Sequence, residues 1–123
     1  MSQGKVLVVD DEISVRTILK QILERSGFEA ETASDGVEAL EKLKAGDFDI
    51  LVTDINMPNM DGVALLKKSK EDYENLPVIF ITAFGKDKII IEAMKVGLND
   101  FIEKPFKMDA VISTINRYIK RKG

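Results

Sequence analysis

Five polar residues lie at or just after the ends of apolar runs, where such side chains can bind ions. Asp10 and Asp11 follow one run, Asp54 ends a second, and Thr82 and Lys104 end two more. Three neighbouring carboxylates raise one another's pKa values unless a cation neutralises them. No arginine is expected beside them, and one lysine is too little. Mg²⁺, or else Mn²⁺, is the natural partner, and it would also neutralise a phosphoryl oxygen.

Each of these residues also has an ordinary structural explanation. An aspartate after a strand is usually a helix N-cap, and Asp11 or Asp35 could be only that. Thr82 could be a turn residue, and Lys104 could be a solvated surface charge. Their joint occurrence at four strand ends is much harder to explain by capping and solvation, so we interpret them as one site.

The apolar runs are the strands that must position these residues. Residues 5–10, 49–54 and 77–82 are almost continuously hydrophobic, which is typical of strands buried on both faces of a parallel sheet. Residues 28–33 alternate between apolar and polar side chains and predict a less buried edge strand. Residues 100–104 predict a short fifth strand.

Helical patterns separate the strands. Apolar side chains recur at helical spacing in residues 12–26, 35–45, 62–72, 86–96 and 107–121. The first pattern includes Ile18 on the face expected to be buried. Alternating strands and helices predict an α/β fold, a doubly wound parallel sheet of five strands flanked by five helices. The carboxyl ends of its strands share one edge, where ligands bind.

Composition narrows the function classes. The 123 residues show no linker and predict one domain over residues 1–123. The chain has no cysteine or histidine, which excludes a thiolate metal site, a cysteine nucleophile and a phosphohistidine of its own. No stretch predicts a signal peptide or a membrane span, so we expect a cytoplasmic protein that does not bind membranes.

The charge balance argues against direct binding of nucleic acid. The net charge is −3, whereas proteins that bind phosphate backbones are normally basic. The basic residues among 117–122 suit the C-terminal end of a helix, where cations are favoured.

The chain resembles the receiver domain of two-component response regulators, the family that includes the chemotaxis response regulator. The resemblance covers essentially the whole chain and rests on the motifs "VLVVDDE" (6–12), "DINMPNMDG" (54–62), "VIFITA" (78–83) and "FIEKPF" (101–106). It implies a flavodoxin-like sheet with strand order 2-1-3-4-5. It also implies a single-domain, phosphorylation-activated signalling switch.

The resemblance assigns roles to the acidic residues. Asp54 is expected to accept a phosphoryl group from a histidine kinase or a histidine phosphotransfer protein. Asp11 and Asp54 are expected to bind Mg²⁺ through their carboxylates, and Asn56 through its backbone carbonyl. Asp10 is expected to support the metal. Carboxylates are known nucleophiles in covalent phosphoryl transfer.

The resemblance also implies a switch. Lys104 is expected to pair with the phosphoryl group, and Thr82 to donate its hydroxyl to it. Phe101 is expected to change rotamer when Thr82 moves. The Lys104–Pro105 peptide bond is expected to be cis, which is tolerable only before proline.

The expected partner surface is formed by the fourth helix, the fifth strand and the fifth helix. Ile89, Ile90 and Ile91 are consecutive, so they sweep a wide arc of the helix and at least one should be exposed. We name Ile89, Ile90 and Phe101 as the partner face. It would bind an unknown downstream protein or a second, phosphorylated copy.

Two alternatives stay open from the sequence. The chain could be the receiver part of a longer regulator that has an output domain. It could also be a phosphatase of the haloacid dehalogenase class, which forms an aspartyl phosphate too. The segment Asp54-Ile55-Asn56 lacks the second aspartate of that class. We therefore expect a receiver that catalyses its own phosphorylation and slow dephosphorylation, not an enzyme with other substrates.

Asn56 and Phe84 lie two residues after Asp54 and Thr82, at places that tune the lifetime of the phosphoryl group in this family. We expect the bulky Phe84 to shield the phosphoryl group from water and slow its loss. Phe84→Ala and Phe84→Glu should shorten the half-life measured by loss of radiolabelled phosphate. Unchanged decay in both variants would contradict this role.

Overall fold

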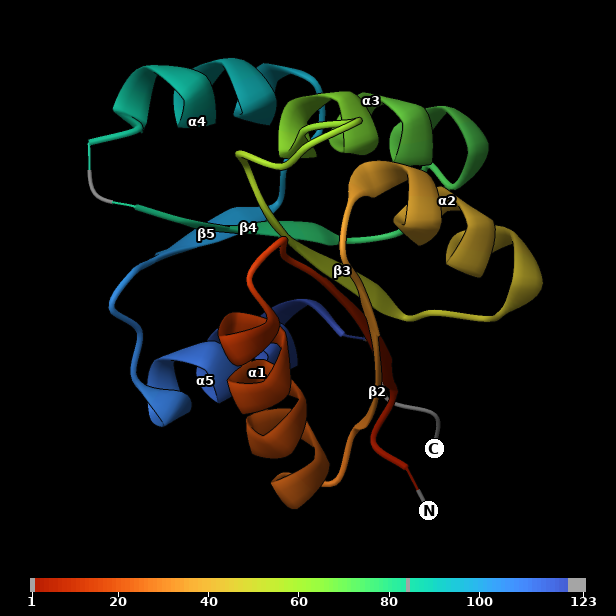
Figure 1. The fold of residues 1–123 in the computed structure, drawn as a ribbon, viewed down its shortest axis with the longest axis vertical. Helices are drawn as coiled ribbons and strands as arrows, with labels where there is room; N and C mark the ends of the chain where they lie inside the picture. Colours follow the sequence, from red (N-terminus) through yellow and green to blue (C-terminus); the bar gives the residue numbers. More distant parts are fainter. Residues whose placement is uncertain (1, 84, 120–123) are drawn as a thin grey trace.

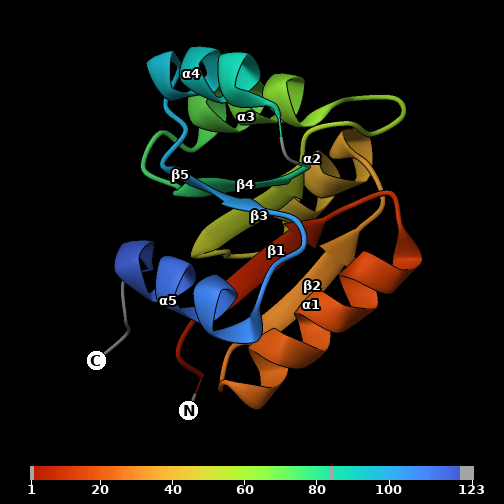
Figure 2. The ribbon, with the colours of Figure 1, turned by 90° about the vertical axis from the view of Figure 1, so that its left-hand side faces the viewer.

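A computed structural model describes residues 2–83 and 85–119 as an α/β sandwich (Figures 1 and 2). The strands are Lys5–Val9 (β1), Glu29–Ala33 (β2), Ile50–Asp54 (β3), Val78–Thr82 (β4) and Asp100–Glu103 (β5). The helices are Ile13–Arg25 (α1), Gly36–Ala45 (α2), Gly62–Asp72 (α3), Asp87–Lys95 (α4) and Met108–Tyr118 (α5).

All four strand pairings are parallel, and the strand order is β2-β1-β3-β4-β5. Helices α1 and α5 cover one face of the sheet, and α2, α3 and α4 cover the other (Figure 1). The predicted fold class and strand order are confirmed.

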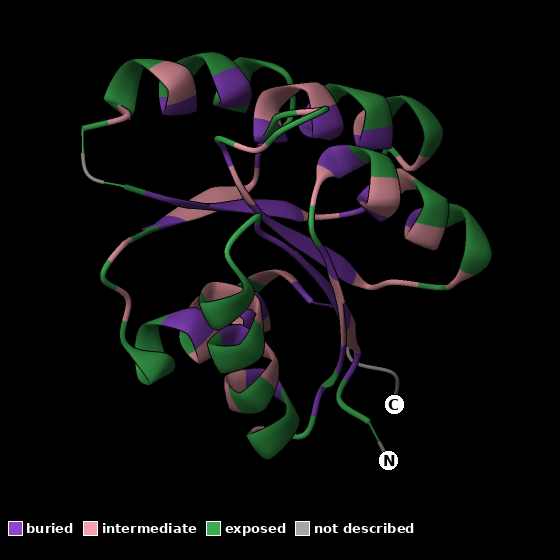
Figure 3. Cartoon of the chain, viewed as in Figure 1, coloured by how far each residue is buried: buried purple, intermediate pink, exposed green. Residues whose placement is uncertain are grey.

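The core forms two layers because β-strand side chains alternate between faces. In β1, Val6 and Val8 pack in the cluster that includes Leu19 of α1, whereas Leu7 and Val9 pack in the opposite cluster. Buried residues are concentrated in the sheet and on the inner sides of the helices (Figure 3). Burial on both faces explains why the central strands are almost continuously apolar.

Strand β2 is the less buried edge strand that its alternating pattern predicted. Ala30 and Ala33 are buried, whereas Glu29 is exposed and the two remaining residues are half-buried. The strand needs few apolar side chains because it lies at the edge of the sheet, next to β1.

The prediction for Ile18 was wrong. This side chain is 49% exposed, although Leu19 beside it is buried. Successive residues are about 100° apart around a helix, so α1 buries the stripe formed by Leu19 and Leu23 and leaves Ile18 at its outer side. Among the described residues, no helix has the length and apolar character needed to cross a membrane.

Gly62 allows the start of α3 to approach the strand that carries Asp54. A Cβ atom on Gly62 would overlap the Asp54 carbonyl oxygen and lie 2.9 Å from the Ile55 Cα. The Gly62 amide donates a 2.7 Å hydrogen bond to the Ile55 carbonyl. Glycine at this position therefore allows the start of α3 to pack closely against the loop that follows Asp54.

We expect Gly62→Ala to lower the free energy of unfolding by about 1–3 kcal/mol, the usual cost of forcing extra atoms into a packed site. Gly46→Ala is the control, because the nearest atoms to its new Cβ would be the Phe48 ring and the Lys5 ammonium, at 3.3 and 3.4 Å. Urea unfolding measures both. Equal losses in the two variants would contradict the close-approach explanation.

Candidate functional site

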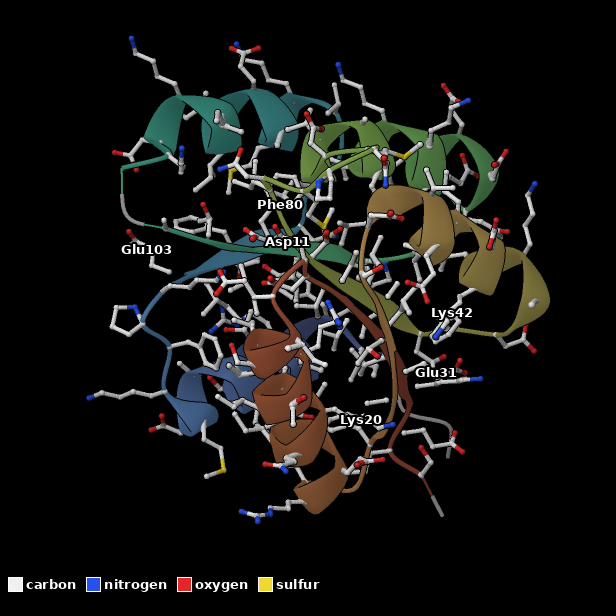
Figure 4. The ribbon with its side chains drawn as sticks, in the orientation of Figure 1. Asp11, Lys20, Glu31, Lys42, Phe80 and Glu103 are labelled. Atoms are coloured by element: carbon white, nitrogen blue, oxygen red, sulfur yellow. The ribbon has the colours of Figure 1, made fainter. Side chains whose placement is uncertain are left out.

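The sheet brings the predicted polar residues to one edge. Asp54 and Thr82 are the last residues of β3 and β4, and Asp10 and Lys104 directly follow β1 and β5. Figure 4 labels Asp11 beside the end of β1. The parallel topology therefore places residues from distant parts of the sequence at a common carboxyl edge.

Asp10 is the most firmly held residue of the site, and its side chain is buried. Its amide donates to the Ala33 carbonyl at 3.1 Å, and its Oδ1 accepts from the Glu12 amide at 2.9 Å. Its Oδ2 lies 3.3 Å from the Lys104 ammonium, and its carbonyl accepts a 2.6 Å hydrogen bond from the Arg16 guanidinium. Every polar group of Asp10 thus has a partner, as buried polar groups usually do.

Lys104 also links Asp10 to the second strand end. Its Nζ lies 3.5 Å from Oδ2 of Asp54, whose side chain is 13% exposed. The other Asp54 oxygen accepts from the Ile55 amide at 2.8 Å. The Lys104–Pro105 peptide bond is cis, as predicted, and the Lys104 amide donates to the Thr82 carbonyl at 2.8 Å.

The pKa shifts of Asp10 and Lys104 reflect both burial and neighbouring charge. Burial raises the pKa of Asp10, and the nearby Asp54 charge raises it further, although the Glu12 amide and Lys104 act in the opposite direction. Burial alone lowers the pKa of Lys104, but Asp10 and Asp54 outweigh burial and raise it overall. The raised pKa of Asp10 is thus mainly an effect of burial, whereas the raised pKa of Lys104 is an effect of the two carboxylates beside it.

The donor set suits a divalent cation. Carboxylate oxygens of Asp10, Asp11 and Glu12 lie within 4.8 Å of one another, and Asp11 and Glu12 are exposed. Such oxygens are the ligands that Mg²⁺ prefers, and a cation would relieve the excess negative charge. The sequence analysis missed Glu12, although the run "DDE" contained the signal. Asn56 is exposed in the loop after β3.

The sequence analysis also missed Arg16. We expected no arginine near the acidic residues, but the Arg16 side chain reaches the Asp10 carbonyl from α1. It stands near the N-terminal end of that helix. Its position one turn after the "DDE" run was the available signal.

The proposed switch residues lie on neighbouring strands, Thr82 at the carboxyl end of β4 and Phe101 near the start of β5. Thr82 is 1% exposed, and its hydroxyl donates to the neighbouring Ala83 carbonyl at 3.2 Å. Phe101 is half-buried and packs against the core cluster beneath α3 and α4. Phe84 lies outside the described residues.

Part of the predicted partner face was wrong. Ile90 is only 4% exposed and belongs to the core, whereas Ile91 is 56% exposed and Ile89 is half-buried. The physical reason is the turn of the helix, which points the middle isoleucine at the sheet. As expected, one of the three isoleucines is exposed.

The chain belongs to the response regulator receiver domain family, whose model matches residues 6–116. It is 43% identical over 120 residues to the chemotaxis protein CheY-3 of Vibrio cholerae, covering 95% of this chain and 92% of that protein. It is 40% identical over 119 residues to the DNA-binding transcriptional regulator NtrC of Escherichia coli, covering 97% of this chain and 25% of that protein.

Solved structures agree with this assignment. The structure of the Vibrio cholerae chemotaxis protein CheY4 at low pH has a TM-score of 0.91 and 34% identity, covering 96% of this chain and all of that one. A receiver domain protein from Clostridium thermocellum has a TM-score of 0.89 and 32% identity, covering 94% of each chain. The chain is therefore a phosphorylation-activated signalling switch, and the phosphatase alternative is not favoured.

We expect Asp10→Asn to unfold at a higher temperature than the wild type at pH 7 without divalent cations. A carboxyl whose folded pKa is raised costs stability as pH rises from its ordinary pKa through its raised pKa, and asparagine carries no charge. The gain should shrink at lower pH, where folded Asp10 takes up a proton. Thermal unfolding followed by circular dichroism across pH measures it.

Glu24→Gln is the control, because Glu24 is exposed on α1 away from the site. Its unfolding temperature should follow the wild type at each pH. A lower unfolding temperature for Asp10→Asn at pH 7 would contradict a net cost of burying the charged Asp10 carboxylate.

Proposed function

We propose that Asp54 accepts a phosphoryl group from a phosphohistidine of a kinase or of a phosphotransfer protein. The observation that carries this proposal is a partly exposed carboxylate at the carboxyl end of a central strand, with the Lys104 ammonium 3.5 Å from its Oδ2. The exposed side of Asp54 gives a donor access, and the ammonium can follow an incoming anion.

In the reaction, an Asp54 carboxylate oxygen attacks the phosphorus and forms a P–O bond. The P–N bond of the donor breaks, and its electron pair returns to the histidine nitrogen. Lys104 pairs with the added charge. A divalent cation held by Asp11, Asp54 and the Asn56 carbonyl, with Asp10 and Glu12 beside it, would neutralise the transferred group when bound.

The new charge then acts on the switch. The Thr82 hydroxyl exchanges its bond to the Ala83 carbonyl for one to the phosphoryl group, and Phe101 changes rotamer in response. This is a local charge event transmitted by an element with two states. The responding surface comprises α4, β5 and α5. Its exposed Ile91 and half-buried Ile89 would contact a downstream protein or a second copy.

Further parts of the proposal come from the sequence. Asn56 is exposed after β3, and there it would influence the access of water to the phosphoryl group. The chain would act in the cytoplasm as a single receiver domain over residues 1–123, without contacting nucleic acid or membrane. Its catalysis would be limited to its own phosphorylation and dephosphorylation.

Incubation with acetyl phosphate and Mg²⁺, followed by intact-mass measurement, should show one added phosphoryl group in the wild type. Asp54→Asn should show none, because the amide is not a competent nucleophile. Asp47→Asn is the control, because Asp47 lies in the loop before β3, at the opposite end of that strand. Equal labelling of Asp54→Asn and the wild type would reject Asp54 as the acceptor.

A further inference from the structure

The turn between β1 and α1 carries Asp10, Asp11 and Glu12. Arg16 forms two hydrogen bonds to this turn, one from its side chain and one from its backbone amide. The Arg16 guanidinium donates to the Asp10 carbonyl at 2.6 Å, and the Arg16 amide donates to the Glu12 carbonyl at 3.2 Å. The Glu12 amide in turn donates to the Asp10 carboxylate. These three hydrogen bonds close the turn from which the acidic side chains project.

The guanidinium bond acts on the peptide group that joins Asp10 to Asp11. The Asp10 carbonyl belongs to that group, so holding it fixes the plane from which the exposed Asp11 begins. A hydrogen bond from a charged donor is stronger than a neutral one, and its short length agrees with that. Arg16 touches no carboxylate oxygen by this bond, so its effect on a cation would be indirect.

The placement of Arg16 is unfavourable for the helix alone. A positive charge near the N-terminal end of α1 opposes the helix dipole, although the acidic N-cap residue Glu12 and the two aspartates before it supply negative charge there. Its charge would also repel a cation bound at the acidic turn. The helix dipole and a bound cation would both disfavour an arginine here, whereas the acidic turn and the bond to the Asp10 carbonyl favour it.

We propose that Arg16 is a positioning residue for the divalent-cation site, which holds Asp10 and Asp11 in the arrangement that binds the ion. This inference rests on the proposed metal site. It makes a prediction of definite sign: loss of the arginine weakens Mg²⁺ binding, although loss of a positive charge by itself would strengthen it.

The test is a Mg²⁺ titration followed by ¹H–¹⁵N NMR in the wild type, Arg16→Gln, Arg16→Lys and Lys20→Gln. Lys20 is the matched control, because it lies one turn further along α1 and lines the same shallow groove, but its charge acts on Glu31 of β2 (Figure 4). Lys20→Gln removes the same charge without touching the acidic turn.

We expect Arg16→Gln to weaken Mg²⁺ affinity about tenfold, as changes in groups that orient metal ligands commonly do. Arg16→Lys should lie between Arg16→Gln and the wild type, because an ammonium can still donate to the carbonyl without the planar fork. Lys20→Gln should bind as tightly as the wild type or slightly more tightly. The ¹⁵N shift of Asp11 before Mg²⁺ is added should move in Arg16→Gln and stay in Lys20→Gln.

Unchanged or tighter Mg²⁺ binding by Arg16→Gln, with binding by the wild type intact, would overturn the role of Arg16 alone. Absence of saturable binding by the wild type would overturn the proposed metal site and this inference together. If Arg16→Gln does not fold, Arg16→Lys decides the matter, and affinity equal to that of the wild type would then overturn the proposal.

Discussion

At the carboxyl edge of the sheet, the Lys104 ammonium contacts the carboxylates of Asp10 and Asp54. Two further acidic residues, Asp11 and Glu12, directly follow Asp10. Lys104 lies 3.3 Å from Asp10 and 3.5 Å from Asp54. By formal charge, the carboxylates of this cluster outnumber the one ammonium that contacts them. This excess of negative charge favours binding of a divalent cation. It also means that the other contacts of the site must hold the carboxylates close together against their repulsion.

Contacts from several elements hold the acidic side chains in place against this repulsion. Asp10 is fixed from β2, from its own turn, from α1 and from the segment after β5. Asp54 is held more lightly, by Lys104 and by the amide of its own neighbour. The buried carboxylate is therefore a fixed part of the site, whereas the partly exposed one has fewer contacts and keeps the freedom required for its proposed role as nucleophile.

The fold class could be predicted from the sequence because apolar residues recur at different spacings in its strands and in its helices. The almost continuous runs in β1, β3 and β4 and the alternation in β2 each predicted the observed burial. The joint position of Asp10, Asp54 and Lys104 followed from parallel topology. The strand order itself came from the family resemblance and not from the residues.

The errors have separate physical origins. Ile18 and Ile90 were misplaced because periodicity defines an apolar face but does not fix which side of it meets the sheet. Arg16 was missed because it bonds to a backbone carbonyl. Every residue has such a group, so the sequence does not mark which one accepts the bond. Glu12 was passed over because a third acidic residue in a run looks like an ordinary exposed charge.

Strand β5 carries Phe101 near its start, and Lys104 follows its end, so one short segment belongs to both the chemical site and the outer face. Binding free energies coupled through a shared element are reciprocal. With Asp54 as the proposed phosphoryl acceptor, a protein that binds the phosphorylated form of this face more tightly would stabilise that form by the same free energy. A bound target would therefore stabilise the phosphorylated state that it recognises. Target binding and phosphorylation would then be two linked equilibria.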